Sequence, residues 1–228
     1  MKKLMLMAAA AVASAAMGSS AMAATVMPVG VQNDVGYSTV VNDWGWTQIY
    51  RGDYSATASI ADMLAGAKKY VMIGAIKDGT KTIEVLAATT LADFLTVTNQ
   101  NQTHLSNGAQ WYFSGGSLGF AGAGDTISQN SADINGSTWT GPENERDRLS
   151  WHTSGGYGLA PTEVTGGWRA GSYIELNGST EWDRVIFTTD TLGSAVPEPA
   201  TWAMMIIGFG AVGTMVRGSR RRTMAALA

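Results

Sequence analysis

The sequence predicts a mainly β protein. An antiparallel β-sandwich or jelly-roll-like body with one or two short helices lies between an apolar N-terminal helix and an apolar C-terminal helix. Three observations predict this fold. Short apolar runs alternate with Gly, Asn, Asp and Ser turn signals throughout the body. Few segments have helical periodicity. Both ends of the chain are apolar runs next to basic residues.

The N-terminal segment, residues 1–23, has the composition of a secretory signal peptide. Lys2 and Lys3 precede an apolar run over residues 4–16, and a small-x-small motif follows. We therefore expect a signal helix that signal peptidase removes, so that the exported chain begins at Ala24. The residues of the predicted cleavage site are Ala21, Ala23 and Ala24.

The body, residues 24–195, contains short β-type runs separated by turn chemistry such as Asn107-Gly108 and Asn177-Gly178. In residues 44–50 the bulky apolar side chains fall mostly at every second position, as in a half-buried strand. Its 172 residues are enough for one domain with a sizeable core. The predicted strands are 37–41, 44–51, 70–76, 81–88, 109–113, 117–121, 147–153, 167–176 and 181–189.

Two segments of the body predict helices. In residues 59–69, Ile60, Met63, Leu64 and Ala67 share one face at helical spacing, and Ser59 is placed to cap the first turn. A second, weaker candidate covers residues 90–94.

The C-terminal segment, residues 196–222, combines a rigid polar motif, an apolar run and an arginine cluster, and residues 223–228 form a short tail. The two prolines hold Pro197-Glu198-Pro199 extended. The apolar run over 202–216 predicts a membrane helix, although its 15 residues fall short of the roughly 20 that span a bilayer comfortably. The arginines that mark the predicted cytoplasmic side are Arg217, Arg220, Arg221 and Arg222.

This tail resembles the PEP-CTERM sorting signal of Gram-negative bacteria in its PEPxxWA form. The resemblance implies that an exosortase-type membrane protease reads the motif. It also implies an inner-membrane-anchored intermediate whose product goes to the cell surface or to an extracellular, biofilm-type matrix. The same tail also carries the label ice-binding protein C-terminal domain, but the Thr-x-Thr units of the body are few and irregularly spaced. The residues that carry the match are Pro197, Glu198, Pro199, Trp202 and Ala203.

Charge and cysteine content exclude several classes of function. The whole chain has a net charge of −3, but the body alone has 17 acidic and nine basic residues, because six basic residues lie in the two tails. Such an acidic body argues against nucleic-acid binding. With no cysteine, the chain can build neither disulfides nor thiolate metal sites.

The sequence predicts no catalytic residues. The only histidines are His104 and His152, and neither a Gly-x-Ser-x-Gly elbow nor a recognisable triad accompanies them. Carboxylates spaced like those of a glycosidase leave a glycan-active hydrolase open as an alternative. These carboxylates are Glu143, Glu145, Asp147, Glu181 and Asp183.

No cofactor is predicted, and calcium is the one metal ion left open. Asp133, Asn135 and Ser137 are spaced like the first oxygen ligands of a calcium loop. Asn144 stands where an EF-hand places its bidentate glutamate, so the match to that loop fails there and only a looser calcium site remains.

The seven tryptophans of the body have two interpretations: they fill the core, or they stack on sugar rings. We expect at least five of the seven in the core and single out Trp139, in the loop-like segment 136–141, as a candidate glycan contact. The sequence thus predicts an exported, non-enzymatic structural or glycan-binding protein, with extracellular polysaccharide as its candidate partner.

Overall fold

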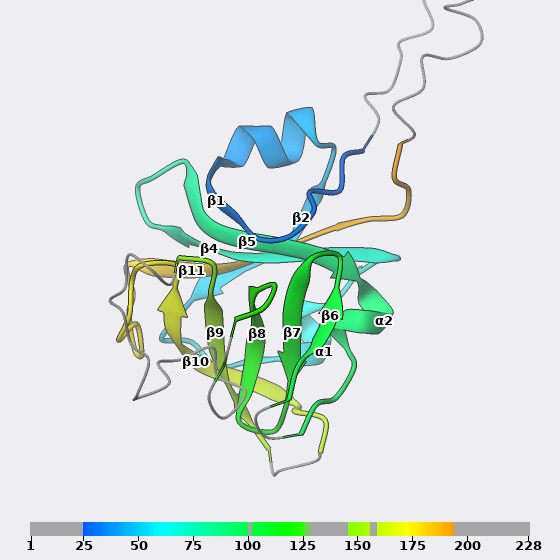
Figure 1. Ribbon diagram of the computed structural model, residues 1–228. Coiled ribbons are helices and arrows are strands. Elements are labelled where there is room, and N and C mark those ends of the chain that lie inside the picture. Colours follow the sequence, from blue (N-terminus) through cyan, green and yellow to red (C-terminus); the bar gives the residue numbers. More distant parts are fainter. Residues whose placement is uncertain (1–24, 100–101, 126, 128–145, 156–158, 194–228) are drawn as a thin grey trace, which may run out of the picture.

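The computed structural model describes residues 25–99, 102–125, 127, 146–155 and 159–193 (Figure 1). These residues form two antiparallel sheets with short helical turns between some of the strands. The strand order of the first sheet is β1-β5-β4-β11-β2, and that of the second is β3-β10-β9-β8-β7-β6. The predicted mainly antiparallel β body with few, short helices is therefore confirmed.

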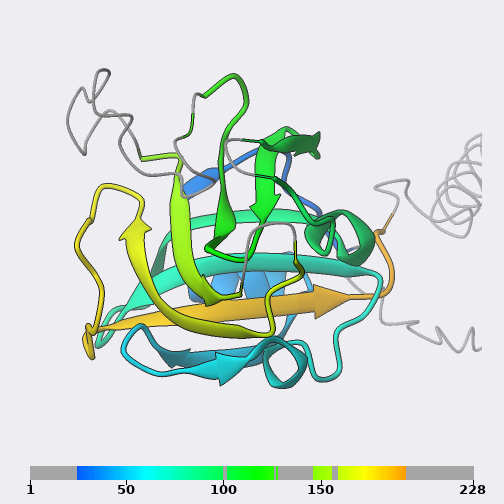
Figure 2. The ribbon, with the colours of Figure 1, turned by 90° about the horizontal axis from the view of Figure 1, so that it is seen from below.

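The five-stranded sheet consists of β1 (Gln32–Gly36), β2 (Thr47–Asp53), β4 (Tyr70–Lys77), β5 (Thr82–Thr90) and β11 (Trp182–Thr189). The six-stranded sheet consists of β3 (Ala58–Ser59), β6 (His104–Ser106), β7 (Ala109–Phe113), β8 (Ser117–Gly122), β9 (Leu149–Ser154) and β10 (Glu163–Ala170). Figure 2 shows the two sheets as successive layers, with β11 in orange inside the first.

The main core lies between the two sheets. Ile73 of the first sheet belongs to the same buried cluster as Trp111, Phe120 and Trp151 of the second. Each of these four side chains is at most 1% exposed. Burial of these large apolar side chains, worth about 25 cal/mol per Å² removed from water, is the main force that holds the sheets together.

A second core covers the outer face of the five-stranded sheet. Met72 and Leu86 of the sheet pack in one cluster with Val40 and Trp46, which come from the segment that crosses this face. The sheet is therefore buried on both sides. This explains why residues 70–76 read as a continuous apolar run rather than as an alternating pattern.

The prediction of a strand at 37–41 is wrong. Thr39–Asp43 form η1, a π-helix in which the backbone N–H of Trp44 donates to the carbonyl of Thr39 at 2.8 Å. The β-branched residues at 39–41 favour a strand. Packing prevails over that preference, because the helix buries Val40 in the second core while Asn42 and Asp43 face solvent.

The helix predicted at 59–69 is shorter than expected. Only α1 (Ile60–Met63) is helical, and the Ser59 side chain caps it as predicted by accepting a hydrogen bond from the Asp62 N–H. Gly66 adopts a left-handed φ of +81°, which ends the helical path. The weaker candidate at 90–94 is confirmed as α2 (Leu91–Phe94), capped by Thr90.

Most other strand predictions hold to within two or three residues. The clearest exception is the strand predicted at 167–176, which is instead β10, at Glu163–Ala170. Gly171, with a φ of +57°, turns the chain at its end, and Tyr173 then pairs back onto Ala170. The short strands β1, β3 and β6 were not predicted.

The two ends of the described body lie together. The backbone N–H of Gly193 donates to the carbonyl of Thr25 at 2.9 Å, and the N–H of Val26 donates to the carbonyl of Trp44 at 3.0 Å. Figure 1 shows the blue start and the orange end leaving the same corner of the molecule. The helices predicted within 1–23 and 196–222 lie outside the described residues. None of the helices in the described part is long and apolar enough to cross a membrane.

Candidate functional site: a cationic groove beside the β4–β5 turn

A groove of about 330 Å³ opens at the end of the five-stranded sheet where β4 turns into β5. We call it the Arg51 groove. Its walls come from four places in the chain: the segment after β1, strand β2, strand β4 and the β4–β5 turn. The residues that line it are Tyr37, Ser38, Arg51, Ile76, Thr80 and Lys81.

Local hydrogen bonds fix the β4–β5 turn. Gly79 has a φ of +75°, a left-handed conformation that glycine adopts without a Cβ clash. The Thr80 hydroxyl donates to the Lys77 carbonyl at 2.7 Å, and the Lys81 carbonyl accepts from the Tyr37 N–H at 2.8 Å. The turn and the segment after β1 are thus joined directly, which sets the width of the groove at this point.

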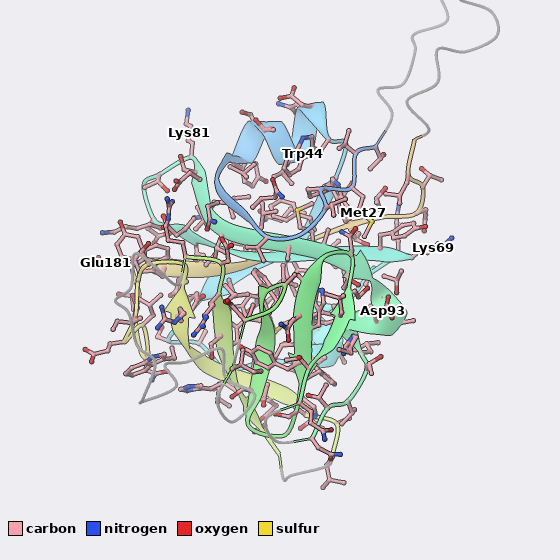
Figure 3. The ribbon with its side chains drawn as sticks, in the orientation of Figure 1. Met27, Trp44, Lys69, Lys81, Asp93 and Glu181 are labelled. Atoms are coloured by element: carbon pink, nitrogen blue, oxygen red, sulfur yellow. The ribbon has the colours of Figure 1, made fainter. Side chains whose placement is uncertain are left out.

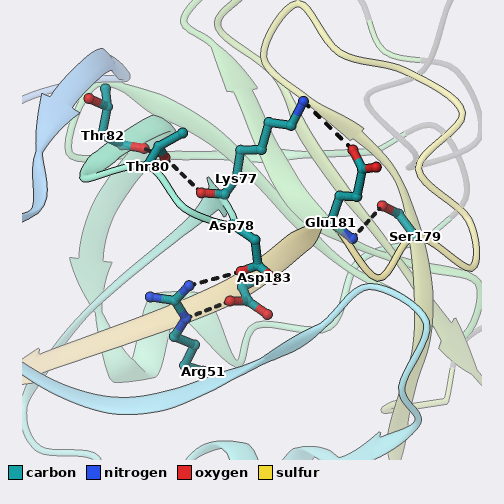
Figure 4. A network of polar contacts seen from close by, with 8 residues as sticks. All are labelled: Arg51, Lys77, Asp78, Thr80, Thr82, Ser179, Glu181 and Asp183. Carbon is teal, nitrogen blue, oxygen red and sulfur yellow. Dashed lines mark hydrogen bonds and ion pairs between the residues drawn. The ribbon is translucent and has the colours of Figure 1, made fainter.

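Two carboxylates hold the guanidinium of Arg51. Its Nε donates to Asp183 Oδ2 at 2.5 Å, and its Nη2 donates to Asp78 Oδ1 at 3.1 Å (Figure 4). The Asp183 side chain is 7% exposed, whereas that of Asp78 is 49% exposed. One partner is therefore anchored inside the sheet and the other sits at the rim, so that Arg51 is oriented along the groove wall.

Asp183 is an unusual carboxylate because it lies on β11, an interior strand of the sheet that has β4 on one side and β2 on the other. It faces Asp53 on β2 and Ile76 on β4. Burial raises its pKa to about 6; the Arg51 guanidinium opposes this rise, and the carboxylates of Asp78 and Asp53 add to it. Protonation of Asp183 near neutral pH would remove one of the two anchors of Arg51.

Several polar groups of the groove have no partner among the described residues. The Lys81 ammonium forms no ion pair there, in contrast to Lys77, whose Nζ lies 3.7 Å from Glu181 Oε2 on the other side of the turn. The Nη1 group of Arg51 and the Ser38 hydroxyl likewise make no hydrogen bond within the described part of the chain. These groups are available to a ligand.

The Tyr37 ring forms the aromatic wall. It packs 5.9 Å from the Phe187 ring at a tilt of 54°, which fixes its orientation. It supplies apolar surface next to hydroxyls and two cations, above the buried Ile76 side chain. This combination suits a ligand that has both an apolar face and hydroxyl or acidic groups.

The tryptophans mostly fill the cores, as expected. Trp46, Trp111, Trp151 and Trp182 are buried, with exposures of 4% or less. Trp44 and Trp168 are partly buried. The predicted glycan contact Trp139 lies outside the described residues, and so do the predicted calcium segment 133–137, the signal-peptidase site and the sorting motif.

Each described carboxylate of the set named for a hydrolase is engaged with a different partner. Glu181 pairs with Lys77, and Asp183 pairs with Arg51. Asp147 accepts a hydrogen bond from the Asn33 amide in another part of the molecule, and Glu143 and Glu145 lie outside the described residues. The structure brings Asp183 close to Asp78 and Asp53 instead, a set that the sequence pattern did not indicate.

Ser150 and His152 do not form a catalytic pair. Within the described residues no hydrogen bond joins them, and Ser150 is fully buried. Burial lowers the pKa of His152. The neutral form of this imidazole is therefore favoured by its half-buried position on β9.

The sequence does not predict the groove, because no motif links the residues that line it. Tyr37, Arg51 and Lys81 are far apart in the chain and meet only through the order of the strands. The one available signal was the Asp78-Gly79 turn with lysines on both sides, which marks an exposed, charged hairpin end.

Comparison with known proteins identifies the tail and not the body. Residues 195–222 match the family model described as the PEP-CTERM protein-sorting motif. No curated protein and no solved structure matches the chain. The chain therefore carries a PEP-CTERM protein-sorting motif at its C-terminal end, and this match supports its identification as a PEP-CTERM sorting-signal protein.

Proposed function

We propose that this protein is a non-enzymatic component of the cell surface or extracellular matrix that binds polysaccharide in the Arg51 groove. The sorting motif supports export and processing by an exosortase-type protease at the membrane, toward the cell surface. Export places the body where polysaccharide is the abundant polymer. The groove then gives the body a surface with which to hold it.

The observation that carries the proposal is the chemical mixture in the groove. Tyr37 offers an aromatic face, Ser38 a hydroxyl without a described partner, and Arg51 and Lys81 offer charged donors. Sugar rings present C–H faces that pack on aromatic rings, and hydroxyls that exchange hydrogen bonds with such donors. A site with these properties can bind a sugar without hydrolysing a glycosidic bond.

The set of residues that line the groove also supports binding rather than catalysis. Asp183 and Asp78 are bound to the Arg51 guanidinium and do not line the groove. A glycosidase needs two carboxyl groups on opposite sides of the scissile bond, about 5 to 9.5 Å apart. Here the two carboxylates share one cation on one side.

One observation favours the alternative of a glycan-active hydrolase. The pKa of Asp183, about 6, is in the range that a general acid needs near neutral pH, and Asp78 stands beside it on the same guanidinium. The hydrolase therefore remains the second candidate.

One experiment distinguishes the two. The full chain, purified in mild detergent, is incubated with the polysaccharide of the producing organism, and both retention and new reducing ends are measured. Retention with no new reducing ends supports the binding function. New reducing ends that disappear in Asp183→Asn support the hydrolase, and the absence of both results rejects the two candidates together.

A further inference from the structure

We propose that the Arg51 groove selects carboxylated sugars, with the carboxylate of a uronic acid residue bound by Arg51 and Lys81; this rests on the proposed glycan-binding function. The basis is that both cations in the groove lining have donors without a described partner, and no carboxylate belongs to the lining. A neutral sugar would leave the Lys81 ammonium without a counter-ion, since among the described residues only Arg51 of the two is paired with carboxylates.

Arg51 is already held in place. Asp183 and Asp78 bind Nε and one N–H of Nη2, and both contacts lie on the same side of the guanidinium (Figure 4). Nη1 and the second N–H of Nη2 remain, and together they form a fork that matches a carboxylate. Since the side chain is ordered before the ligand arrives, less rotamer entropy is lost on binding.

Lys81 supplies the second charge. Within the described part of the chain its ammonium has no ion-pair partner, whereas Lys68 and Lys77 each lie within 4 Å of a carboxylate. The Lys81 side chain extends from the β4–β5 turn at the edge of the molecule (Figure 3). An acidic ligand gains this contact without breaking an existing one.

The remaining walls fit the rest of a sugar ring. The Tyr37 ring offers apolar contact, and the Ser38 hydroxyl can donate to or accept from a ring hydroxyl. A volume of about 330 Å³ lies near the lower end of the range of about 300 to 1,000 Å³ that ligand sites occupy. The groove therefore suits a short part of a chain and not a long stretch of polymer.

The acidic body confines this recognition to the groove. The body has 17 acidic and nine basic residues, so a polyanion is repelled over most of its surface. Six of the nine basic residues are engaged elsewhere: Lys68, Lys77, Arg146 and Arg148 pair with carboxylates, and Arg169 and Arg184 are fully buried. We therefore expect one acidic oligosaccharide per protein and not diffuse charge-driven coating.

The test compares ligands that differ in their acidic group. The full chain in mild detergent is titrated calorimetrically with a short oligogalacturonate, with its methyl ester, in which the carboxylates are masked, and with a sulfated oligosaccharide of similar length. We expect one site for the oligogalacturonate and affinity lower by about tenfold or more for the methyl ester, the size of effect that one charge-assisted contact produces.

Variants locate the site. Lys81→Gln and Arg51→Gln should each weaken oligogalacturonate binding by about tenfold. Lys77→Gln is the matched control, because Lys77 is at the other end of the same turn, pairs with Glu181 and does not line the groove. Lys81→Gln breaks no ion pair among the described residues, so its fold should be unchanged, as thermal unfolding would verify.

Each outcome has a distinct meaning. Equal binding of the ester and the acid overturns the carboxylate inference and leaves the binding function standing. Tighter binding of the sulfated ligand also overturns it, as does an equal loss of affinity in Lys77→Gln. Binding of none of the three ligands overturns the inference, and the proposed function fails separately only if the producer's own polysaccharide is not retained either.

Discussion

The Arg51 guanidinium donates a 2.5 Å hydrogen bond from Nε to the carboxylate of Asp183, and this bond joins the edge strand β2 to the buried strand β11. The contact connects the exposed groove wall to the interior of the sheet. Protonation of the buried Asp183 carboxylate would weaken this hydrogen bond, and the position of Arg51 in the groove wall therefore depends on the charge of one carboxylate.

This relationship predicts a pH dependence of stability. The folded-state pKa of Asp183 is about 6, above its ordinary value of 3.8, so the folded protein binds this proton more tightly than the unfolded chain does. Stability from this group is then greatest at low pH and falls as pH rises from about 4 through 6. The free energy of unfolding of the wild type should decrease, relative to Asp183→Asn, between pH 4 and pH 7.

Denaturant unfolding at a series of pH values measures this difference. Asp190→Asn, which removes an exposed carboxylate paired with Lys68, controls for the loss of a surface charge. A constant difference between the wild type and Asp183→Asn across the whole range would contradict the raised pKa.

The close approach of β8 and β9 predicts a strict requirement for glycine at position 119. A Cβ atom on Gly119 would lie 2.0 Å from the Leu149 carbonyl oxygen and 2.6 Å from the Tyr112 hydroxyl. Since neither group can move without breaking the 2.7 Å hydrogen bond between them, Gly119→Ala should cost at least about 2 kcal/mol. Thermal unfolding would show this as a clear fall in Tm.

Gly116→Ala is the matched control for that substitution. Gly116 lies in the turn that joins β7 to β8, and a Cβ atom there meets nothing within 4 Å. We expect its Tm to stay close to that of the wild type. A similar loss in both variants would mean that the strand contact is not the cause.

The buried Arg184 predicts a large loss of stability on its removal. Its side chain donates to the Asp53 carbonyl at 2.6 Å, to the Ala56 carbonyl and to the Gly166 carbonyl at 3.4 Å, and the residue has 0% exposure. Arg184→Met leaves these three carbonyls without their charged donor and removes a fully buried side chain from its contacts, so we expect a loss of about 3 kcal/mol.

Chemical denaturation tests this against Lys68→Met. Lys68 forms an exposed ion pair with Asp190, and such pairs contribute about 0 to 1 kcal/mol. A loss for Arg184→Met as small as that for Lys68→Met would show that water replaces the guanidinium at the three carbonyls.

The sorting motif predicts the C-terminus of the exported protein. Mass spectrometry of the surface or secreted form should find an end close to Pro197 and no peptide containing Arg220 to Arg222. Glu198→Ala should retain the tail, whereas Thr201→Ser, at a position that the PEPxxWA pattern leaves variable, should be processed like the wild type. An exported form with its arginines intact would reject the assignment.

Sequence patterns predicted the strands best where local chemistry and packing agree. The segment 109–113 follows an Asn-Gly turn and is β7, with the predicted bounds. At 37–41 the same reasoning failed. The preference of β-branched residues for strands is weaker there than the gain from burying Val40, which belongs to the π-helix η1, in the second core. The helix predicted at 59–69 ends at Met63. The glycine at position 66, which adopts a left-handed φ, is a sequence signal against a longer helix that periodicity alone ignores.

The groove could not have been predicted in the same way. Arg51 and Asp183 are 132 positions apart and meet because β2 pairs with β11 rather than with its neighbour in sequence. Lys81 and Tyr37 meet through a backbone hydrogen bond, because Tyr37 follows β1, Lys81 precedes β5, and these two strands pair. Strand order decides these contacts, and neither composition nor periodicity encodes strand order. The sorting motif, in contrast, is a continuous segment and is legible from its residues alone.

The hydrogen bond between Thr25 and Gly193 holds the two ends of the described body together at one end of the first sheet. β11 leads toward Gly193 from Thr189, which pairs with Tyr70, whereas the groove end of the sheet is at the Asp183–Ile76 pair. The two pairs are six residues apart along the strand, or about 20 Å at roughly 3.3 Å per residue. The groove and Gly193 therefore lie toward opposite ends of β11, and none of the residues that line the groove belongs to the segment after Gly193.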